Sequence, residues 1–142
     1  PVEMPGRFEI GTHNSPGLAG LAAGVSFIRS VGLDAIEEKG RRQISGMIQA
    51  LKEYEAISIQ HPEPDLPILS CNIAGIENDD LGFILARKYH LIVRTGLHCA
   101  PRIHDALDQG SGSVRISLSW FTTDEECRKA CRALGEIAER CG

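Results

Sequence analysis

The chain has 142 residues, which is enough to bury one hydrophobic core without disulfides or metals but too few for two domains of ordinary size. Its composition, 42% hydrophobic and 24% charged, is typical of a soluble globular protein, and a net charge of −4 argues against a nucleic-acid-binding surface. Five cysteines without framework spacing, no signal peptide and no apolar run of about 18 residues predict a reducing, cytoplasmic setting and no membrane partner.

Helices are predicted in the first third of the chain. Ser15 followed by Pro16 is a good helix start, because serine can cap free amide groups and proline fits the first helical turn. An apolar stripe at helical spacing extends this helix to about residue 30. The stripe consists of Leu18, Leu21, Val25 and Ile28. The pattern continues over residues 33–51, and because Gly40 and Gly46 weaken it, one long helix and two shorter ones are both possible.

A β-hairpin and a third helix are predicted next. Residues 56–60 and 68–74 indicate strands, and the proline-rich residues 61–67 indicate the turn between them. Asn78 is the predicted cap of the following helix, which has aspartates in its first turn and basic residues in its last. Residues 91–93 indicate another short strand, which leads directly into the segment discussed below.

The last part of the chain predicts a strand and a closing helix. Residues 114–119 alternate between apolar and polar side chains, which places Arg115 on the face turned away from the core. Thr123 and Glu126 form a capping box for the helix that follows. Its buried stripe consists of Cys127, Ala130, Cys131, Leu134, Ile137, Ala138 and Cys141. We therefore predict a two-layer α+β fold, with helices packed on one face of a small, mainly antiparallel sheet.

Residues 94–104 predict a reactive-cysteine loop around Cys99. The cationic neighbours of the cysteine are Arg94, His98, Arg102 and His104. No acidic residue occurs in the segment before Asp105. Cationic groups favour the thiolate, which is the nucleophilic form of cysteine. The alternative is an inert, buried thiol, which is the more common role of a free cysteine.

The other cysteines are interpreted as structural. Cys127 and Cys131 have a spacing that could suggest a metal pair, but they fall on an apolar stripe and no second ligand pair follows. Cys71 lies within a predicted strand and is also expected in the core. We therefore predict no metal site.

Residues 110–112 are a short glycine-containing turn without the strand-to-helix context of a phosphate loop.

Three segments together carry a family resemblance. They are Arg94-Thr95-Gly96-Leu97-His98-Cys99-Ala100, then Arg7-Phe8-Glu9-Ile10-Gly11-Thr12-His13-Asn14 with Gly17, Gly20 and Leu21, and Val114-Arg115-Ile116-Ser117 with Trp120-Phe121-Thr122-Thr123. In order and spacing they resemble the C-terminal part of cysteine desulfurases of the SufS and selenocysteine lyase type, which are class V aminotransferase-like enzymes. Leu97 departs from the commoner histidine at its position, which leaves the subgroup open.

The resemblance implies that residues 1–142 are the single, small C-terminal domain of a fold-type I pyridoxal-phosphate enzyme, with residues 1–14 as the domain junction. The large domain and its cofactor-binding lysine would precede residue 1, since none of the lysines has a matching context. These are Lys39, Lys52, Lys88 and Lys129. The start at Pro1, without an initiator methionine, agrees with a truncated or excised piece.

The implied activity is a pyridoxal-phosphate-dependent cysteine desulfurase that acts in iron–sulfur cluster assembly or related sulfur metabolism. Cys99 would take sulfur from L-cysteine as a persulfide, release alanine and pass the sulfur to an acceptor protein. Arg115 would bind the substrate α-carboxylate, while Arg94 and His98 would tune Cys99 or position substrate. Thr12 would reach the cofactor phosphate of the other subunit in a homodimer. The isolated chain is expected to be inactive.

Two alternatives remain open from the sequence. Another class V activity, such as an aminotransferase, a β-lyase or an epimerase, would use the same Arg115 but would not require Cys99. A purely structural or dimer-contact role of the isolated chain would require neither residue. His13 and Asn14, beside Thr12, are also typical of a helix cap and turn.

Overall fold

The computed structural model describes residues 3–9, 11–106 and 110–141. Pro1, at the start of the expected junction segment, and Ile10, in one of the three motifs, lie outside the described residues. The chain divides into two compact units, Pro1–Ile36 and Glu37–Gly142. Each unit is described separately below.

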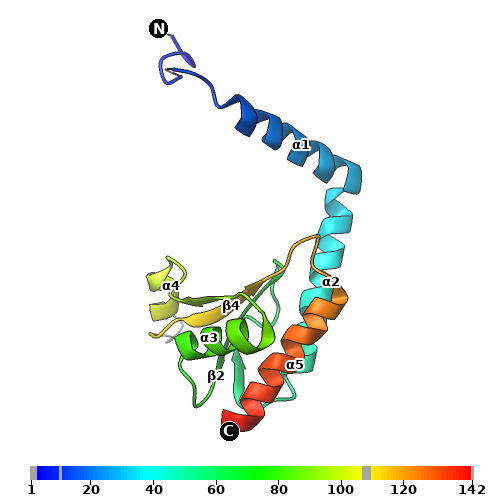
Figure 1. Cartoon of the computed structure of the whole chain (residues 1–142), viewed down its shortest axis with the longest axis vertical. Helices are drawn as coiled ribbons and strands as arrows, with labels where there is room; N and C mark the ends of the chain where they lie inside the picture. The colour runs from blue at the N-terminus through cyan, green and yellow to red at the C-terminus, as the bar shows by residue number, and fades with distance from the viewer. Residues whose placement is uncertain (1–2, 10, 107–109, 142) are drawn as a thin grey trace. The chain divides into compact units, whose positions relative to one another are not determined.

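The first unit contains helix α1, Ser15–Val31 (Figure 1). The cap is Asn14 rather than Ser15, because the Asn14 side chain accepts a hydrogen bond from the Gly17 amide at 3.0 Å and Ser15 is already helical. The predicted apolar stripe is exposed, and α1 contains no buried residue. The helix ends at Gly32, whose φ of 92° favours glycine, so residues 15–51 form two helices and not one.

The second unit contains a four-stranded antiparallel sheet. Its strands are β1, Ile57–Ile59; β2, Ile68–Ile73; β3, Arg94–Gly96; and β4, Ser113–Ser117. They are arranged in the order β1-β2-β4-β3. The remaining helices of the chain are α2, Leu33–Leu51, which begins in the first unit and continues into the second; α3, Asn78–Tyr89; α4, Pro101–Ala106; and α5, Asp124–Cys141.

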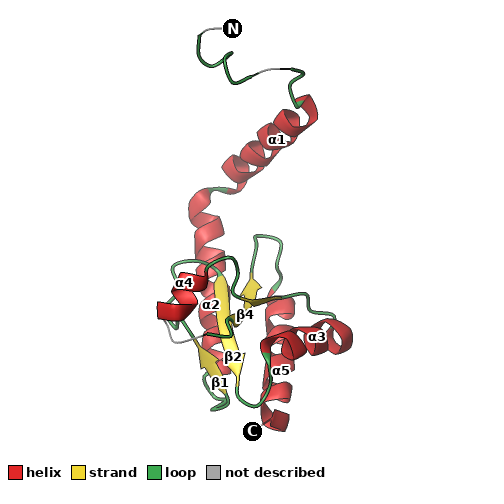
Figure 2. Cartoon of the chain, turned by 90° about the vertical axis from the view of Figure 1, so that its left-hand side faces the viewer, coloured by secondary structure: helices red, strands yellow, loops and turns green. Residues whose placement is uncertain are grey.

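The core of this unit lies between the sheet and three helices (Figure 2). Helix α2 contributes Ile44 and Leu51, α3 contributes Leu81, and α5 contributes Leu134, all fully buried. On the sheet, β2 alternates between half-buried and buried positions, so that one face meets the helices. The predicted two-layer α+β fold is confirmed.

Three local predictions are wrong. The strand predicted at residues 91–93 lies instead at Arg94–Gly96, where the backbone finds its partner in β4. Asn78 does not cap α3, because the N-cap is Glu77 and the side-chain Nδ2 of Asn78 instead donates to the Ser111 carbonyl at 3.3 Å. The reactive loop is also less irregular than expected, since residues 101–106 form the short helix α4.

The capping box at the start of α5 is confirmed. The Thr123 amide donates to Glu126 Oε2 at 2.7 Å, and the Glu126 amide donates to Thr123 Oγ1 at 3.2 Å. Cys127 is buried on the stripe behind this cap, and Cys131 and Cys141 are half-buried. This agrees with their interpretation as packing residues.

Among the described residues, no single helix is long and apolar enough to cross a membrane. In the same part of the chain, one pair of helices, α1 and α2, is long and apolar enough when the two are taken together, although the chain bends between them.

A glycine contact sets the distance between β3 and the start of β4. A Cβ atom added at Gly112 would lie 2.3 Å from the Gly96 carbonyl carbon and oxygen, and the φ of Gly112 is 79°. We expect Gly112→Ala to lower the free energy of unfolding by about 2 to 3 kcal/mol, measured by urea denaturation. Gly110→Ala is the matched control, since a Cβ there meets no atom within 4 Å. Equal stability of the two variants would contradict the contact.

Candidate active site

Two arginines lie side by side on the sheet face that is turned away from helices α2, α3 and α5. Val114 is fully buried on the core face of β4, so Arg115 lies on the opposite face. Arg94 of β3 is directly opposite Arg115 in the antiparallel register. Like charges in such a pair repel, and neither arginine takes part in an ion pair within the described part of the chain.

Arg115 has a side-chain hydrogen-bond donor without a partner among the described residues. Its side chain is half-buried, and its Nε atom is buried without a hydrogen-bond partner among the described residues. A guanidinium group carries its donors in a fixed fork that matches the two oxygens of a carboxylate. The arginine pair is therefore suited to a carboxylate ligand, whose negative charge would relieve the repulsion.

Strand β3 delivers the chain into a tight turn that carries Cys99. Thr95 fixes this strand to α3 by donating from Oγ1 to Asp79 Oδ1 at 2.6 Å. The turn closes with a 2.8 Å hydrogen bond from the Ala100 amide to the Leu97 carbonyl. Within it, His98 and Cys99 have φ values of 53° and 61°, in the left-handed region that side chains other than glycine rarely adopt. Cys99 is exposed in this turn.

His98 is turned toward the protein. Its Nε2 atom lies 3.1 Å from Ser113 Oγ, and its ring centroid lies 5.6 Å from that of His104. Burial, followed by the positive charge of Arg115 and then by His104, lowers the pKa of His98. His104 itself is only 6% exposed, on α4.

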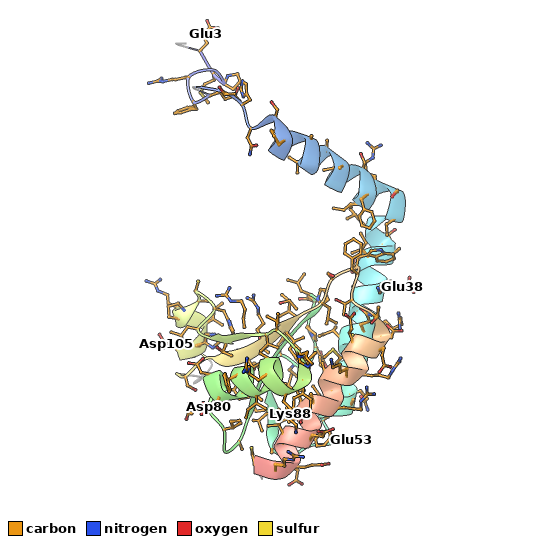
Figure 3. All side chains as sticks on the ribbon, viewed as in Figure 1. Glu3, Glu38, Glu53, Asp80, Lys88 and Asp105 are labelled. Atoms are coloured by element: carbon orange, nitrogen blue, oxygen red, sulfur yellow. The ribbon has the colours of Figure 1, made fainter. Side chains whose placement is uncertain are left out.

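The second unit thus brings together most of the predicted site residues. Arg94, Arg115, His98 and Cys99 lie at neighbouring positions of β3, β4 and the turn between β3 and α4. Asp105, the first acidic residue after Cys99, lies on α4 (Figure 3). Thr12 lies in the exposed segment before α1 in the first unit, and its role toward a cofactor stays a prediction.

Sequence reasoning missed two polar residues behind the site. Ser113 is fully buried against His98, and the Asn72 side chain donates to the Gly112 carbonyl at 3.0 Å, which fixes the start of β4. The asparagine inside an apolar strand segment was a usable signal, because a polar side chain there needs partners. Ser113 gave no such signal, since serine is common at the start of a strand after a glycine turn.

The lysines do not lie at this site. Lys39 donates to the Trp120 carbonyl and lies 4.9 Å from the centroid of the Trp120 ring, and Lys88 donates to the Tyr89 hydroxyl at 2.9 Å. Lys129 lies on α5, and Lys52 directly follows α2. The described residues therefore offer a pair of facing arginines and a thiol, but no amine beside them that could hold an aldehyde cofactor. They also contain no cluster of three or more metal-binding side chains.

Cys99 is expected to be the first cysteine alkylated. Burial raises the pKa of Cys71 to about 12 and that of Cys131 to about 11, and it also raises the pKa of Cys127, whereas Cys99 is exposed. Brief iodoacetamide treatment followed by mass mapping should label Cys99 at least about tenfold faster than these three. Labelling of Cys127 or Cys131 ahead of Cys99 would contradict the exposed turn.

The fold and the site together define a domain of a class V aminotransferase-type enzyme, and comparison with known proteins agrees. The family described as aminotransferase class-V matches residues 2–129, so the chain belongs to this family. It is 32% identical over 139 residues to a probable cysteine desulfurase of Methanothermobacter thermautotrophicus, across 96% of this chain and 35% of that protein. It is 30% identical to a probable cysteine desulfurase of Pyrococcus abyssi, across 97% of this chain and 34% of that protein.

Solved structures are similar over the same extent. The apo cysteine desulfurase of Thermococcus onnurineus NA1 superposes with a TM-score of 0.87 at 29% identity, across 96% of this chain and 34% of that one. A cysteine desulfurase of Escherichia coli superposes with a TM-score of 0.86 at 23% identity, across 97% and 34%, which supports the fold alone. The chain spans about a third of the length of the curated relatives it matches.

Proposed function

We propose that this chain is the C-terminal domain of a pyridoxal-phosphate-dependent cysteine desulfurase, in which Cys99 accepts sulfur from L-cysteine. The observation that carries the proposal is an exposed thiol in the turn that directly follows β3, together with two facing arginines on β3 and β4 that lack acidic partners in the described chain. One end of the site suits a carboxylate and the other a sulfur nucleophile, which matches the two ends of cysteine. The similarity to proteins named cysteine desulfurases supports it.

Arg115 binds the substrate α-carboxylate through two parallel hydrogen bonds, with Arg94 contributing charge beside it. This fixes the orientation of the amino acid, so that its thiol end faces the Cys99 turn. The Cys99 thiolate then attacks the substrate sulfur. A new S–S bond forms, the Cβ–S bond of the substrate breaks, and protonation at Cβ yields alanine, so that L-cysteine and the Cys99 thiol give alanine and a Cys99 persulfide.

Pyridoxal phosphate, when bound, supplies the electron sink that allows bonds at the substrate carbons to break. The lysine that holds it would come from a large domain preceding residue 1, with residues 1–14 as the junction and residues 1–142 as one domain. In a homodimer, Thr12 would approach the cofactor phosphate of the other subunit. The Cys99 persulfide would pass to an acceptor protein in the cytoplasm, for iron–sulfur cluster assembly or related sulfur metabolism.

Product analysis of the full-length enzyme tests this function. With L-cysteine and a thiol reductant, a desulfurase should release alanine and sulfide in equal amounts. Release of pyruvate and ammonia with the sulfide would instead indicate a β-lyase, and formation of a keto acid that retains the sulfur would indicate an aminotransferase. The purified 142-residue chain should release no alanine, because its described residues place no amine at the site.

A further inference from the structure

Ser113 is a buried hydroxyl that the proposed reaction does not use directly. It begins β4, has no solvent exposure, and lies two residues from Arg115 on the same face of the strand. A hydroxyl buried in this way requires a hydrogen-bond partner. His98 provides it, with Nε2 at 3.1 Å from Ser113 Oγ. The contact therefore joins the start of β4 to the residue that immediately precedes Cys99.

We propose that Ser113 is a positioning residue, which holds Cys99 in its exposed turn through His98. The inference rests on the proposed role of Cys99 as the sulfur acceptor. The φ values of His98 and Cys99, 53° and 61°, belong to a region that such residues leave unless the surrounding structure holds them there. The bond to Ser113 turns the His98 side chain inward, and Cys99, the next residue, is left exposed.

His104 supports the same ring from α4. It is 6% exposed, and its ring is tilted by 53° against that of His98. Burial lowers the pKa of His98, as do Arg115 from β4, His104 from α4 and Arg94 from β3, whereas a hydrogen bond with the Ser113 backbone raises it. His98 is half-buried, and a cation there would have no acidic partner among the described residues. The contacts of the ring with Ser113 and His104 thus hold the His98 side chain in place.

Hydrogen exchange on the full-length protein tests, without relying on enzyme activity, whether the bond between Ser113 and His98 anchors the Cys99 turn. The reporter is the Ala100 amide, whose bond to the Leu97 carbonyl closes the turn. Ser113→Ala should speed its exchange about tenfold or more, and the double variant with His98→Leu should be no faster than either single one. Ser117→Ala, an exposed hydroxyl on the same strand, should leave the exchange unchanged. Unchanged exchange in Ser113→Ala would overturn the proposal.

A second readout is the single-turnover formation of the Cys99 persulfide. Ser113→Ala should slow it about tenfold while the KM for cysteine stays the same, because the carboxylate-binding Arg115 is retained. Losses that multiply in the double variant with His98→Leu would show that Ser113 does not act through His98, and would overturn the proposal. If the wild-type enzyme forms no alanine, the proposed function is wrong. The hydrogen-exchange result still tests whether the bond between Ser113 and His98 holds the Cys99 turn.

Alkylation of Cys71 reports whether each variant is folded, since this thiol is fully buried. If Ser113→Ala exposes Cys71, exchange is measured in His98→Leu instead. This variant removes the same hydrogen bond at His98, which is only half-buried. Faster Ala100 exchange in that variant supports the anchor, and unchanged exchange overturns it.

Discussion

Replacing Cys99 by serine in the full-length enzyme is expected to lower alanine release from L-cysteine by on the order of a thousandfold or more. A serine hydroxyl is not ionised near neutral pH and cannot carry sulfur as a persulfide. The exposed turn that presents residue 99 should remain, because serine is close to cysteine in size and the turn is closed by backbone atoms of Leu97 and Ala100. The measurement is alanine release together with intact mass after exposure to cysteine.

Cysteine binding should survive in this variant, since Arg94 and Arg115 are unchanged. The absorbance of the bound cofactor should therefore still respond to cysteine, while the added mass of one sulfur atom is lost. Cys141→Ser, on the half-buried end of α5, is the matched thiol control and should keep both signals. If Cys99→Ser retains wild-type alanine release, sulfur transfer through Cys99 is wrong and a β-lyase becomes the better account.

The features that could be predicted from sequence depend on neighbours a few residues apart. The capping box of Thr123 and Glu126 and the stripe that follows it are defined by spacing along one helix, and both are present. The same applies to β4, where strict alternation placed Arg115 on the face away from the core. Such patterns require no knowledge of which strands pair, so a single sequence is enough.

The wrong predictions concern positions whose structure depends on segments that are distant in sequence. An apolar run favoured a strand at residues 91–93, but pairing with β4 begins only at Arg94, because register depends on the partner. Asn78 has the chemistry of a helix cap, yet its side chain donates to the carbonyl of Ser111, which is distant in sequence. The bond between His98 and Ser113 is of the same kind. A basic loop predicted a reactive thiol, but not the buried hydroxyl behind it.

Replacing Arg115 by lysine is expected to reduce kcat/KM for cysteine roughly 30- to 150-fold, which corresponds to about 2 to 3 kcal/mol. The substitution keeps the positive charge, so electrostatic attraction alone predicts little change. The loss follows from geometry, because an ammonium group cannot form the two parallel hydrogen bonds that a guanidinium offers to a carboxylate. It would also leave the repulsive pairing with residue 94 in place.

The loss should fall on the reaction of cysteine and leave the Cys99 thiol itself intact. Alkylation of Cys99 by iodoacetamide, which has no carboxylate, should therefore remain within about twofold of the wild-type rate in Arg115→Lys. Arg87→Lys, an exposed position on α3, is the matched control and should leave kcat/KM unchanged. Wild-type kcat/KM in Arg115→Lys would contradict the carboxylate-binding role, because that role requires the geometry of the guanidinium group and not only its positive charge. An equal loss in Arg87→Lys would point instead to a general effect of the substitution on the folded protein.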